Sequence, residues 1–186
     1  MTTRLRPAIQ IIALSADDLT RRLEALSEIL HACVHDGASV GFILPFEIDQ
    51  ARAFWTGKVA PALATRRRVV LVAALDGAVA GTVQLDLDTW PNQRHRADVA
   101  KLLVHPRYRR HGVGRALMTA IEPYAKAAGR TLLTLDTAGD AAERLYESLG
   151  YIIGGRIPGY ARAALADRLE ATTYMFKWLG PSGAHA

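Results

Sequence analysis

The first part of the chain places a short apolar run before a segment with helical periodicity. Residues 8–14 (AIQIIAL) predict a short strand. Ser15 and Asp18 follow with the spacing of a capping box, which is typical of a helix start. Five later residues fall on one helical face: Leu19, Leu23, Leu26, Leu30 and Cys33. We therefore predict a helix that begins after Ser15 and ends at Asp36-Gly37.

A loop and a second helix come next. Residues 40–46 are apolar and predict a loop, and residues 49–63 predict a helix with Phe54 and Trp55 as its bulky apolar side chains. Pro61 lies inside this helical pattern and has no backbone N–H, so the last turn of the helix is not expected to be regular.

Two strands joined by a tight turn follow. Residues 69–75 and 79–87 predict the strands, and the second alternates apolar with polar positions. Asp76-Gly77 between them is a strong signal for a hairpin turn. After a polar loop, residues 99–104 predict another strand.

The next helix has the clearest amphipathic pattern. It starts at Gly112, and Pro123 is expected to kink it. Its apolar face consists of Val113, Ala116, Leu117, Ala120, Ile121 and Tyr124. Residues 132–135 then predict a strand that ends in Asp136-Thr137.

The last part of the chain predicts one more helix and two strands. Asp140 and Glu143 have the spacing of a second box-like cap, for a helix over residues 141–149. Residues 151–157 and 172–179 predict the closing strands. This order indicates a mixed α/β (α+β) chain, without the regular alternation of a doubly wound sheet.

Composition restricts the class of protein. Of 186 residues, 50% are hydrophobic and 22% are charged, which excludes intrinsic disorder. This length fits a single domain, which we expect over residues 1–180 with a short tail at 181–186. Cys33 is the one cysteine, so a disulfide scaffold and a cysteine zinc cluster are excluded. Residues 1–7 lead into no long apolar run and no stretch could span a membrane, so we expect a cytoplasmic protein.

The charge balance is basic but does not decide the function by itself. The net charge is +5 at pH 7 and the pI is about 9.7. Such a balance suits nucleic acid, a polyphosphate ligand or an anionic substrate equally well. The chain has no zinc-finger spacing, heptads or basic arm that would favour nucleic acid.

The segment between the strand at 99–104 and the helix at Gly112 carries the sharpest chemical signal. Gly112 and Gly114 remove side chains where the helix begins, so backbone N–H groups can point at an anion. Arg109, Arg110 and Arg115 add positive charge to the helix dipole. This combination predicts a pyrophosphate cradle, although the spacing is neither that of a Walker loop nor G-x-G-x-x-G.

The motif Arg109-x-x-Gly112-x-Gly114 resembles the Arg/Gln-x-x-Gly-x-Gly/Ala signature of the GNAT superfamily of acetyl-CoA-dependent N-acetyltransferases. The resemblance extends over residues 11–179. Within that superfamily, several stretches resemble the tabtoxin-resistance type of small-molecule acetyltransferase. They are residues 37–42, 53–55, 95–102, 135–137 and 158–160.

The resemblance implies a GNAT-like mixed, mostly antiparallel central sheet, splayed after the fourth strand and flanked by about four helices. It implies that the backbone of Leu102, Leu103 and Val104 binds the pantetheine arm and the thioester carbonyl. It also implies that the following loop holds the pyrophosphate, through Arg109, Arg110, His111, Gly112, Val113, Gly114 and Arg115. Acetyl-CoA is then the co-substrate, an amine attacks it directly in a ternary complex, and no metal is needed.

Three side chains are candidates for the proton transfers. Asp98 matches a position that is commonly acidic in this superfamily, and Asp136 ends the next strand, where the sheet should splay. Either could accept the proton of the amine, directly or through water, or bind the ammonium. Tyr146 matches the tyrosine that protonates the departing thiolate in many of these enzymes. The alternatives are strand-end ion pairs for the two aspartates and a core position for Tyr146.

Several functions remain open. The resemblance favours acetylation of the primary amine of a small or amino-acid-like molecule, with no nucleic-acid or membrane partner. A protein acetyltransferase for lysine or N-terminal amines, a non-catalytic acyl-CoA-binding module and a basic nucleic-acid-binding protein are the alternatives. A homodimer, formed through the sheet or the loop 40–46, is one possible assembly.

Overall fold

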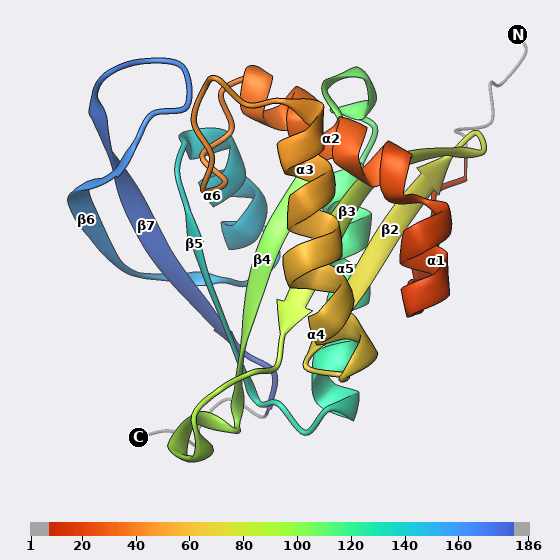
Figure 1. Ribbon diagram of the computed structural model, residues 1–186. Coiled ribbons are helices and arrows are strands. Elements are labelled where there is room, and N and C mark those ends of the chain that lie inside the picture. The colour runs from red at the N-terminus through yellow and green to blue at the C-terminus, as the bar shows by residue number, and fades with distance from the viewer. Residues whose placement is uncertain (1–7, 181–186) are drawn as a thin grey trace, which may run out of the picture.

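A seven-stranded sheet runs through the molecule in the order β1-β2-β3-β4-β5-β7-β6 (Figure 1). The computed structural model describes residues 8–180; residues 1–7, where no leader was expected, and the predicted tail 181–186 lie outside it. Neighbouring strands are antiparallel except β4 and β5, which are parallel. The strands are β1 Gln10–Ala13, β2 Arg68–Leu75, β3 Ala78–Asp86, β4 Arg96–Val104, β5 Leu132–Thr137, β6 Ile152–Arg162 and β7 Leu169–Trp178.

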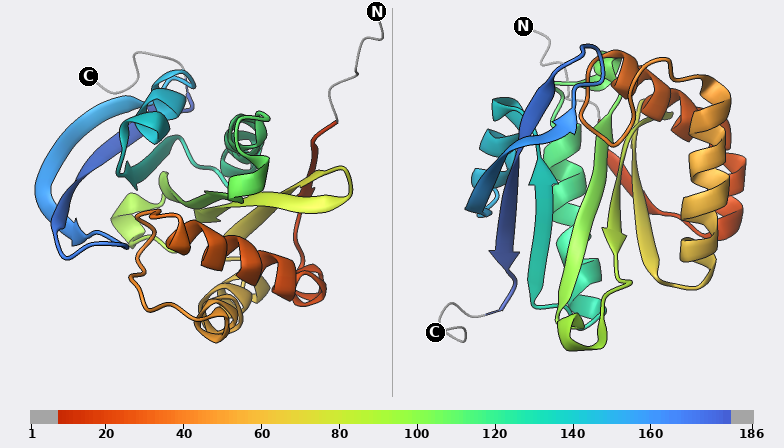
Figure 2. Two further views of the ribbon diagram at one scale, coloured as in Figure 1. Left: turned by 90° about the horizontal axis from the view of Figure 1, so that it is seen from above. Right: turned by 60° about the vertical axis from the view of Figure 1, so that its left-hand side comes forward.

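Helices cover both faces of the sheet. Those that precede β2 pack on one face, and α5 packs on the other (Figure 2). The helices are α1 Ala16–Arg21, α2 Leu23–His35, α3 Ile48–Phe54, a π-helical turn Trp55–Val59, α4 Ala60–Ala64, α5 Val113–Ala127 and α6 Asp140–Glu147. Short 3-10 turns cover Pro91–Gln93 and Pro106–Tyr108. No helix over residues 8–180 is long and apolar enough to cross a membrane.

The capping box predicted at the first helix is present. The backbone N–H of Asp18 donates to Ser15 Oγ at 3.1 Å, and Ser15 N–H donates back to the Asp18 carboxylate at 3.1 Å. The predicted single helix is divided at Arg22, whose φ of −107° and ψ of 11° leave the helical region. This bend allows Leu19 and Leu26 to enter the same buried cluster.

Pro61 perturbs the second helix, but upstream of its own position. The backbone N–H of Ala60 donates to Trp55 O, which widens the helix into a π turn just before the proline. Pro61 then occupies the first turn of α4, where a missing N–H costs no hydrogen bond, and the helix continues to Ala64. Likewise, α5 runs through Pro123 to Ala127.

The second predicted cap is wrong. Gly139, not Asp140, precedes the first turn of α6, and no side chain caps this helix. The Glu143 carboxylate instead accepts a hydrogen bond from Thr173 Oγ1 of β7 at 2.6 Å. A contact with β7 therefore replaces the local capping contact that the spacing predicted. The negative charges of Asp140 and Glu143 in the first turn still stabilise α6 by interacting with the positive end of the helix dipole.

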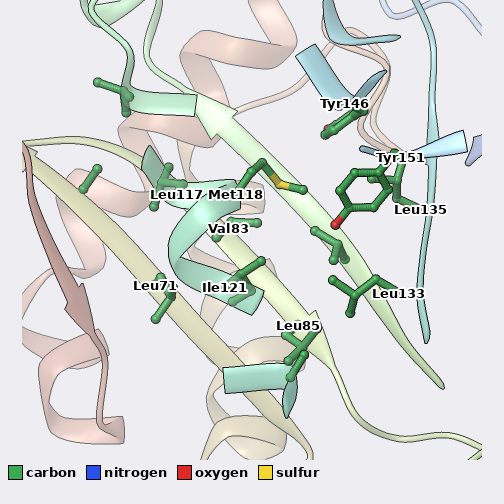
Figure 3. Packing of buried hydrophobic residues seen from close by; sticks show 14 of the residues in the cluster. Leu71, Val83, Leu85, Leu117, Met118, Ile121, Leu133, Leu135, Tyr146 and Tyr151 are labelled. Carbon is green, nitrogen blue, oxygen red and sulfur yellow. The ribbon is translucent and has the colours of Figure 1, made fainter. Parts of the chain in front are cut away.

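The main core lies between the sheet and α5. Leu117 and Ile121 of α5 pack with Leu71, Val83 and Leu85 of β2 and β3, and all five are fully buried (Figure 3). Truncating one of these leucines to alanine is expected to cost about 2–5 kcal/mol, since the surrounding structure closes only partly around a cavity. This rigid layer holds β4 in place for the site described below.

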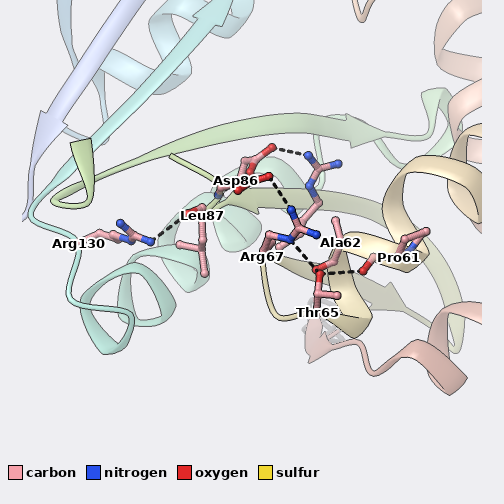
Figure 4. A network of polar contacts seen from close by, with 9 residues as sticks. Pro61, Ala62, Thr65, Arg67, Asp86, Leu87 and Arg130 are labelled. Carbon is pink, nitrogen blue, oxygen red and sulfur yellow. Dashed lines mark hydrogen bonds and ion pairs between the residues drawn. The ribbon is translucent and has the colours of Figure 1, made fainter. Parts of the chain in front are cut away.

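A polar network closes the end of the sheet opposite the splay (Figure 4). The backbone N–H of Leu87 donates to Arg67 O at 2.9 Å, and Arg67 Nε donates to Thr65 Oγ1 at 3.2 Å. From the other side, Arg130 Nη2 donates to Leu87 O at 3.0 Å. The ends of α4 and α5 are thereby connected to the end of β3.

The predicted splay lies between β4 and β5. These strands pair only at Arg96 with Leu132, Ala97 with Leu133 and Asp98 with Thr134. Beyond Asp98 the remainder of β4 has no partner in β5, while β5 continues to pair with β7 up to Thr137. One edge of β4 is therefore open toward a ligand.

Candidate active site

β4 changes its register at the point where it leaves β5. Gln84 of β3 lies opposite Ala100 and Thr82 lies opposite Leu103, so Lys101 and Leu102 together face a single residue of β3. The backbone of Lys101 adopts a φ of 51°, in the left-handed region that residues other than glycine rarely occupy. Such a bulge redirects the side chains of a strand, and here it does so beside the splay.

A first cavity of about 430 Å³ opens on the splayed edge of β4. It collects nearly all residues expected to bind the cofactor, from β4, the following loop and the start of α5. They are Leu102, Leu103, Val104, Arg109, Arg110, Gly112, Val113, Gly114 and Arg115. Ala141, Ala142 and Leu145 of α6 form the opposite wall. His111 is not part of this lining; its Nδ1 lies 2.8 Å from Arg109 O.

The loop before α5 has the backbone geometry of an anion cradle. Arg110 and Gly112 both have left-handed φ values, of 66° and 85°. The first helical hydrogen bond runs from Ala116 N to Gly112 O, so the N–H groups of residues 113–115 have no helical acceptor. A Cβ on Gly114 would lie 3.3 Å from Leu145 Cδ2, so a larger residue there would crowd the Leu145 side chain of α6.

Two of the three arginines of this loop also make contacts within the protein. Arg109 forms an ion pair with Asp36 at the end of α2, and its Nε donates to Val104 O at 3.4 Å. Arg115 Nη2 donates to Ser148 Oγ at 2.8 Å. For Arg110 no hydrogen bond or ion pair to residues 8–180 is found, so its charge is available to a ligand.

A second cavity of about 350 Å³ adjoins the first, since both are lined by Ala38, Leu102 and Ala142. It brings together Tyr146 of α6 and Asp136 of β5, two of the predicted catalytic residues. Tyr146 is 7% exposed, and burial together with the nearby Asp136 carboxylate raises the pKa of its phenol. The phenol therefore stays protonated at neutral pH and is a proton donor.

Asp98 lies apart from this pair. It is absent from the lining of both cavities, and its side chain is 44% exposed. Arg96 Nη1 donates to its carboxylate at 2.5 Å, and Thr134 Oγ1 also donates to it across the last β4–β5 pair. This arrangement is the strand-end ion pair that was the alternative interpretation of Asp98.

Sequence reasoning gave no role to Lys101 and did not foresee that Tyr160 pairs with Tyr174. Lys101 lines the second cavity, and burial lowers the pKa of its ammonium. A lysine inside the apolar run 99–104 was the signal that could have revealed it. The hydroxyls of Tyr160 and Tyr174 lie 2.7 Å apart on β6 and β7, and Tyr160 reaches the same cavity. This hydrogen bond, with some burial, raises the pKa of Tyr174 to about 12.

Comparison with known proteins relates this geometry to a family. The model of the acetyltransferase (GNAT) family matches residues 43–151. A curated relative from Azospirillum brasilense, described as an uncharacterized N-acetyltransferase in the hisH-hisA intergenic region, is 31% identical over 144 residues, covering 75% of this chain and 83% of the relative.

Solved structures show the same fold. An N-acetyltransferase from Staphylococcus aureus Mu50 superposes with a TM-score of 0.76 at 18% identity, covering 93% of this chain and 99% of that one. The putative acetyltransferase yncA from Salmonella typhimurium, solved with acetyl-CoA, gives a TM-score of 0.75 at 20% identity, covering 95% and 97%. The predicted GNAT-like fold, a mostly antiparallel sheet that splays beside the parallel β4–β5 pair, is therefore confirmed.

Proposed function

Since the chain belongs to the acetyltransferase (GNAT) family of acetyl-CoA-dependent enzymes, we propose that it acetylates the primary amine of a small, amino-acid-like molecule. The observation that carries this proposal is the continuity of two cavities along the splayed edge of β4. One cavity contains the anion cradle, and the other contains Asp136 and Tyr146.

The residues of the first cavity fit acetyl-CoA. The free N–H groups at the start of α5 and the charge of Arg110 suit a pyrophosphate. The open edge of β4 at residues 102–104 suits the amide groups of a pantetheine arm, because its backbone has no partner in β5. We propose residues 102–104 and 109–115 as the cofactor-binding residues, with His111 in a peripheral position.

Bound acetyl-CoA supplies the acetyl group as a thioester. Residues of the second cavity accept the proton of the amine and donate a proton to the thiolate. Asp136 attracts the acceptor ammonium and takes its proton, directly or through water, so that a neutral amine can attack the carbonyl carbon. The C–N bond forms as the C–S bond breaks, and the Tyr146 phenol gives its proton to the departing thiolate. Asp98, at the closed end of the splay where β4 and β5 last pair, adds negative charge from outside the cavity lining.

The size of the acceptor is inferred from the second cavity and from the sequence. A volume of about 350 Å³ suits a small molecule. The stretches 95–102 and 158–160, which resemble the tabtoxin-resistance type, contribute Lys101 and Tyr160 to the cavity. We therefore propose a small-molecule acceptor rather than a protein.

Thermal unfolding with acetyl-CoA tests the cradle, and two glycine variants make the test specific. Gly112→Ala and Gly77→Ala place a Cβ at closely similar φ values, 85° and 80°, but Gly77 lies in the β2–β3 turn, away from the site. A ligand at 100 times its Kd stabilises a protein by about 2.7 kcal/mol. We expect wild type and Gly77→Ala to gain stability from acetyl-CoA and Gly112→Ala to gain much less.

A screen of small primary amines, with release of the CoA thiol as the readout, completes the test. We expect thiol release that depends on the amine and on acetyl-CoA. Binding of ATP as strong as that of acetyl-CoA, or release without any amine dependence, would contradict the proposed function.

A further inference from the structure

A third cavity, of about 480 Å³, adjoins the second, and Tyr146 is not part of its lining. Val40, Gly41 and Lys101 line both. The rest of its lining includes Phe42 and Phe54, which provide an apolar wall, together with Gln50, Ala53 and Lys58. Two lysines and no carboxylate therefore line this cavity, which gives it the character of an anion site.

The bulge in β4 places Lys101 between the second and third cavities. Its ammonium has no hydrogen bond or ion pair with residues 8–180; the nearest aromatic contact is the Phe54 ring, with Nζ 5.9 Å from its centroid. Burial lowers the pKa of Lys101, and the charges of Arg68 and Lys58 act in the same direction, while Asp136 opposes them. This partly buried ammonium has no direct partner among residues 8–180, and Asp136 acts on it only from beyond ion-pair distance. An anionic ligand beside Nζ would therefore lower the cost of burying the charge.

Gly41 lines both of these cavities beside Lys101. It has a φ of 86°, and a Cβ built on it would lie 3.8 Å from Lys101 Nζ. A side chain at this position would occupy the space beside the ammonium. The absence of one leaves room for a ligand group next to Nζ.

The charges are ordered along the connected cavities. Asp136 lines only the cavity with Tyr146, Lys58 lines only the third cavity, and Lys101 lines both. An acceptor must bring its amine to the Tyr146 side, where the proton transfers of the proposed function occur. Any negative group on the same molecule would then lie toward Lys101.

We propose that Lys101, assisted by Lys58, binds the carboxylate of an amino-acid acceptor whose amine is held at Asp136, and that Phe42 and Phe54 contact its apolar side chain. The assignment rests on the proposed function, which it makes specific: the acceptor is a zwitterionic amino acid with an apolar or aromatic side chain. Lys101 is then the residue that distinguishes an acid from its neutral carboxamide.

Matched acceptors and matched variants test this assignment. The acceptors are free L-amino acids with apolar side chains and the carboxamide of each. The variants are Lys101→Gln, Lys101→Arg and, as a control, Lys126→Gln, whose lysine is exposed in the last turn of α5. Each acceptor is compared with itself across the variants, which removes the difference in amine basicity between acid and carboxamide.

We expect Lys101→Gln to lower kcat/KM for the acids at least tenfold, mainly through KM, and to change the value for the carboxamides less than threefold. Lys101→Arg should keep most of the activity toward the acids, because it keeps the charge, and Lys126→Gln should match wild type. Calorimetry should show weaker binding of the acids to the CoA complex of Lys101→Gln, while its unfolding temperature stays near that of wild type.

Several outcomes would overturn the assignment. Equal losses for acid and carboxamide in Lys101→Gln would assign Lys101 a structural role. Wild-type acetylation of amines without a carboxylate, but of no amino acid, would refute the amino-acid acceptor and leave the proposed function standing. Failure of wild type to acetylate any amine would refute both the proposed function and the assignment of Lys101.

Discussion

Tyr146 and Asp136 line one cavity, where burial of the phenol and the negative charge of the carboxylate together raise the pKa of Tyr146. One residue comes from α6 and the other from the end of β5. The pair combines a proton donor with an anion that can receive or hold an ammonium.

Replacing Tyr146 by phenylalanine should lower turnover about 10²–10⁴-fold, because general acid catalysis typically contributes that much. Binding of acetyl-CoA, measured by calorimetry, should change little. Tyr151→Phe is the control: its ring centroid lies 5.7 Å from that of Tyr146, yet it is absent from the cavity lining. Turnover in Tyr146→Phe equal to that in Tyr151→Phe would exclude Tyr146 from the mechanism.

Asp136→Asn should lower kcat/KM for the acceptor more than Asp98→Asn does, by at least tenfold. Asp136 lines the cavity with Tyr146, whereas Asp98 is engaged by Arg96 and Thr134 outside it. Steady-state kinetics of both variants with one acceptor make the comparison. The reverse order of effects would assign the base to Asp98.

Tyr160→Phe should return the pKa of Tyr174 from about 12 toward its ordinary value near 10, because the hydrogen bond between the Tyr174 and Tyr160 hydroxyls is the main cause of the shift. In wild type the pKa of Tyr174 is higher in the folded than in the unfolded state. Its contribution to stability is therefore complete below pH 10 and is lost as the pH rises to about 12. Tyrosinate absorbance during alkaline titration measures the shift, and Tyr124→Phe, on an exposed tyrosine of α5, is the control.

Gly81→Ala should destabilise the protein by about 1–3 kcal/mol and weaken acetyl-CoA binding, because overpacking forces the backbone to move. A Cβ on Gly81 would lie 2.7 Å from Leu103 O, in the part of β4 that borders the cofactor cavity. Gly155→Ala is the control, because a Cβ there meets no atom within 4 Å. Denaturant unfolding and calorimetry measure the two effects; normal binding in Gly81→Ala would show that β4 tolerates the displacement.

The sequence allowed prediction where the determinants are local. The Ser15–Asp18 capping box depends on residues three apart and is present. Most of the residues proposed to bind the cofactor gather in one cavity because they lie close together in the chain, at 102–104 and 109–115. Local patterns were sufficient for both features.

Features set by pairing between distant segments were not predictable. The position of Lys101 depends on the register between β3 and β4, which the apolar pattern of 99–104 does not contain. β6 extends to Arg162, beyond the predicted end at residue 157, because an exposed edge strand tolerates Pro158 and Gly159. The different surroundings of Asp98 and Asp136 were likewise not predictable, because they depend on where β4 and β5 stop pairing: Asp98 lies in the last pair and Asp136 lies beyond it, in the cavity lining.

In the proposed function, the two substrates bind to different parts of the chain on the two sides of the splay. The donor cavity is built mainly from residues 102–115 and α6, whereas much of the acceptor side comes from residues 38–42 and from Tyr160, Ala161 and Thr172. Substitutions in the second set can therefore change which amine is accepted while the handling of acetyl-CoA stays intact. During evolution, such a division lets one acetyl-transferring half acquire new acceptors by exchanging short segments of the other.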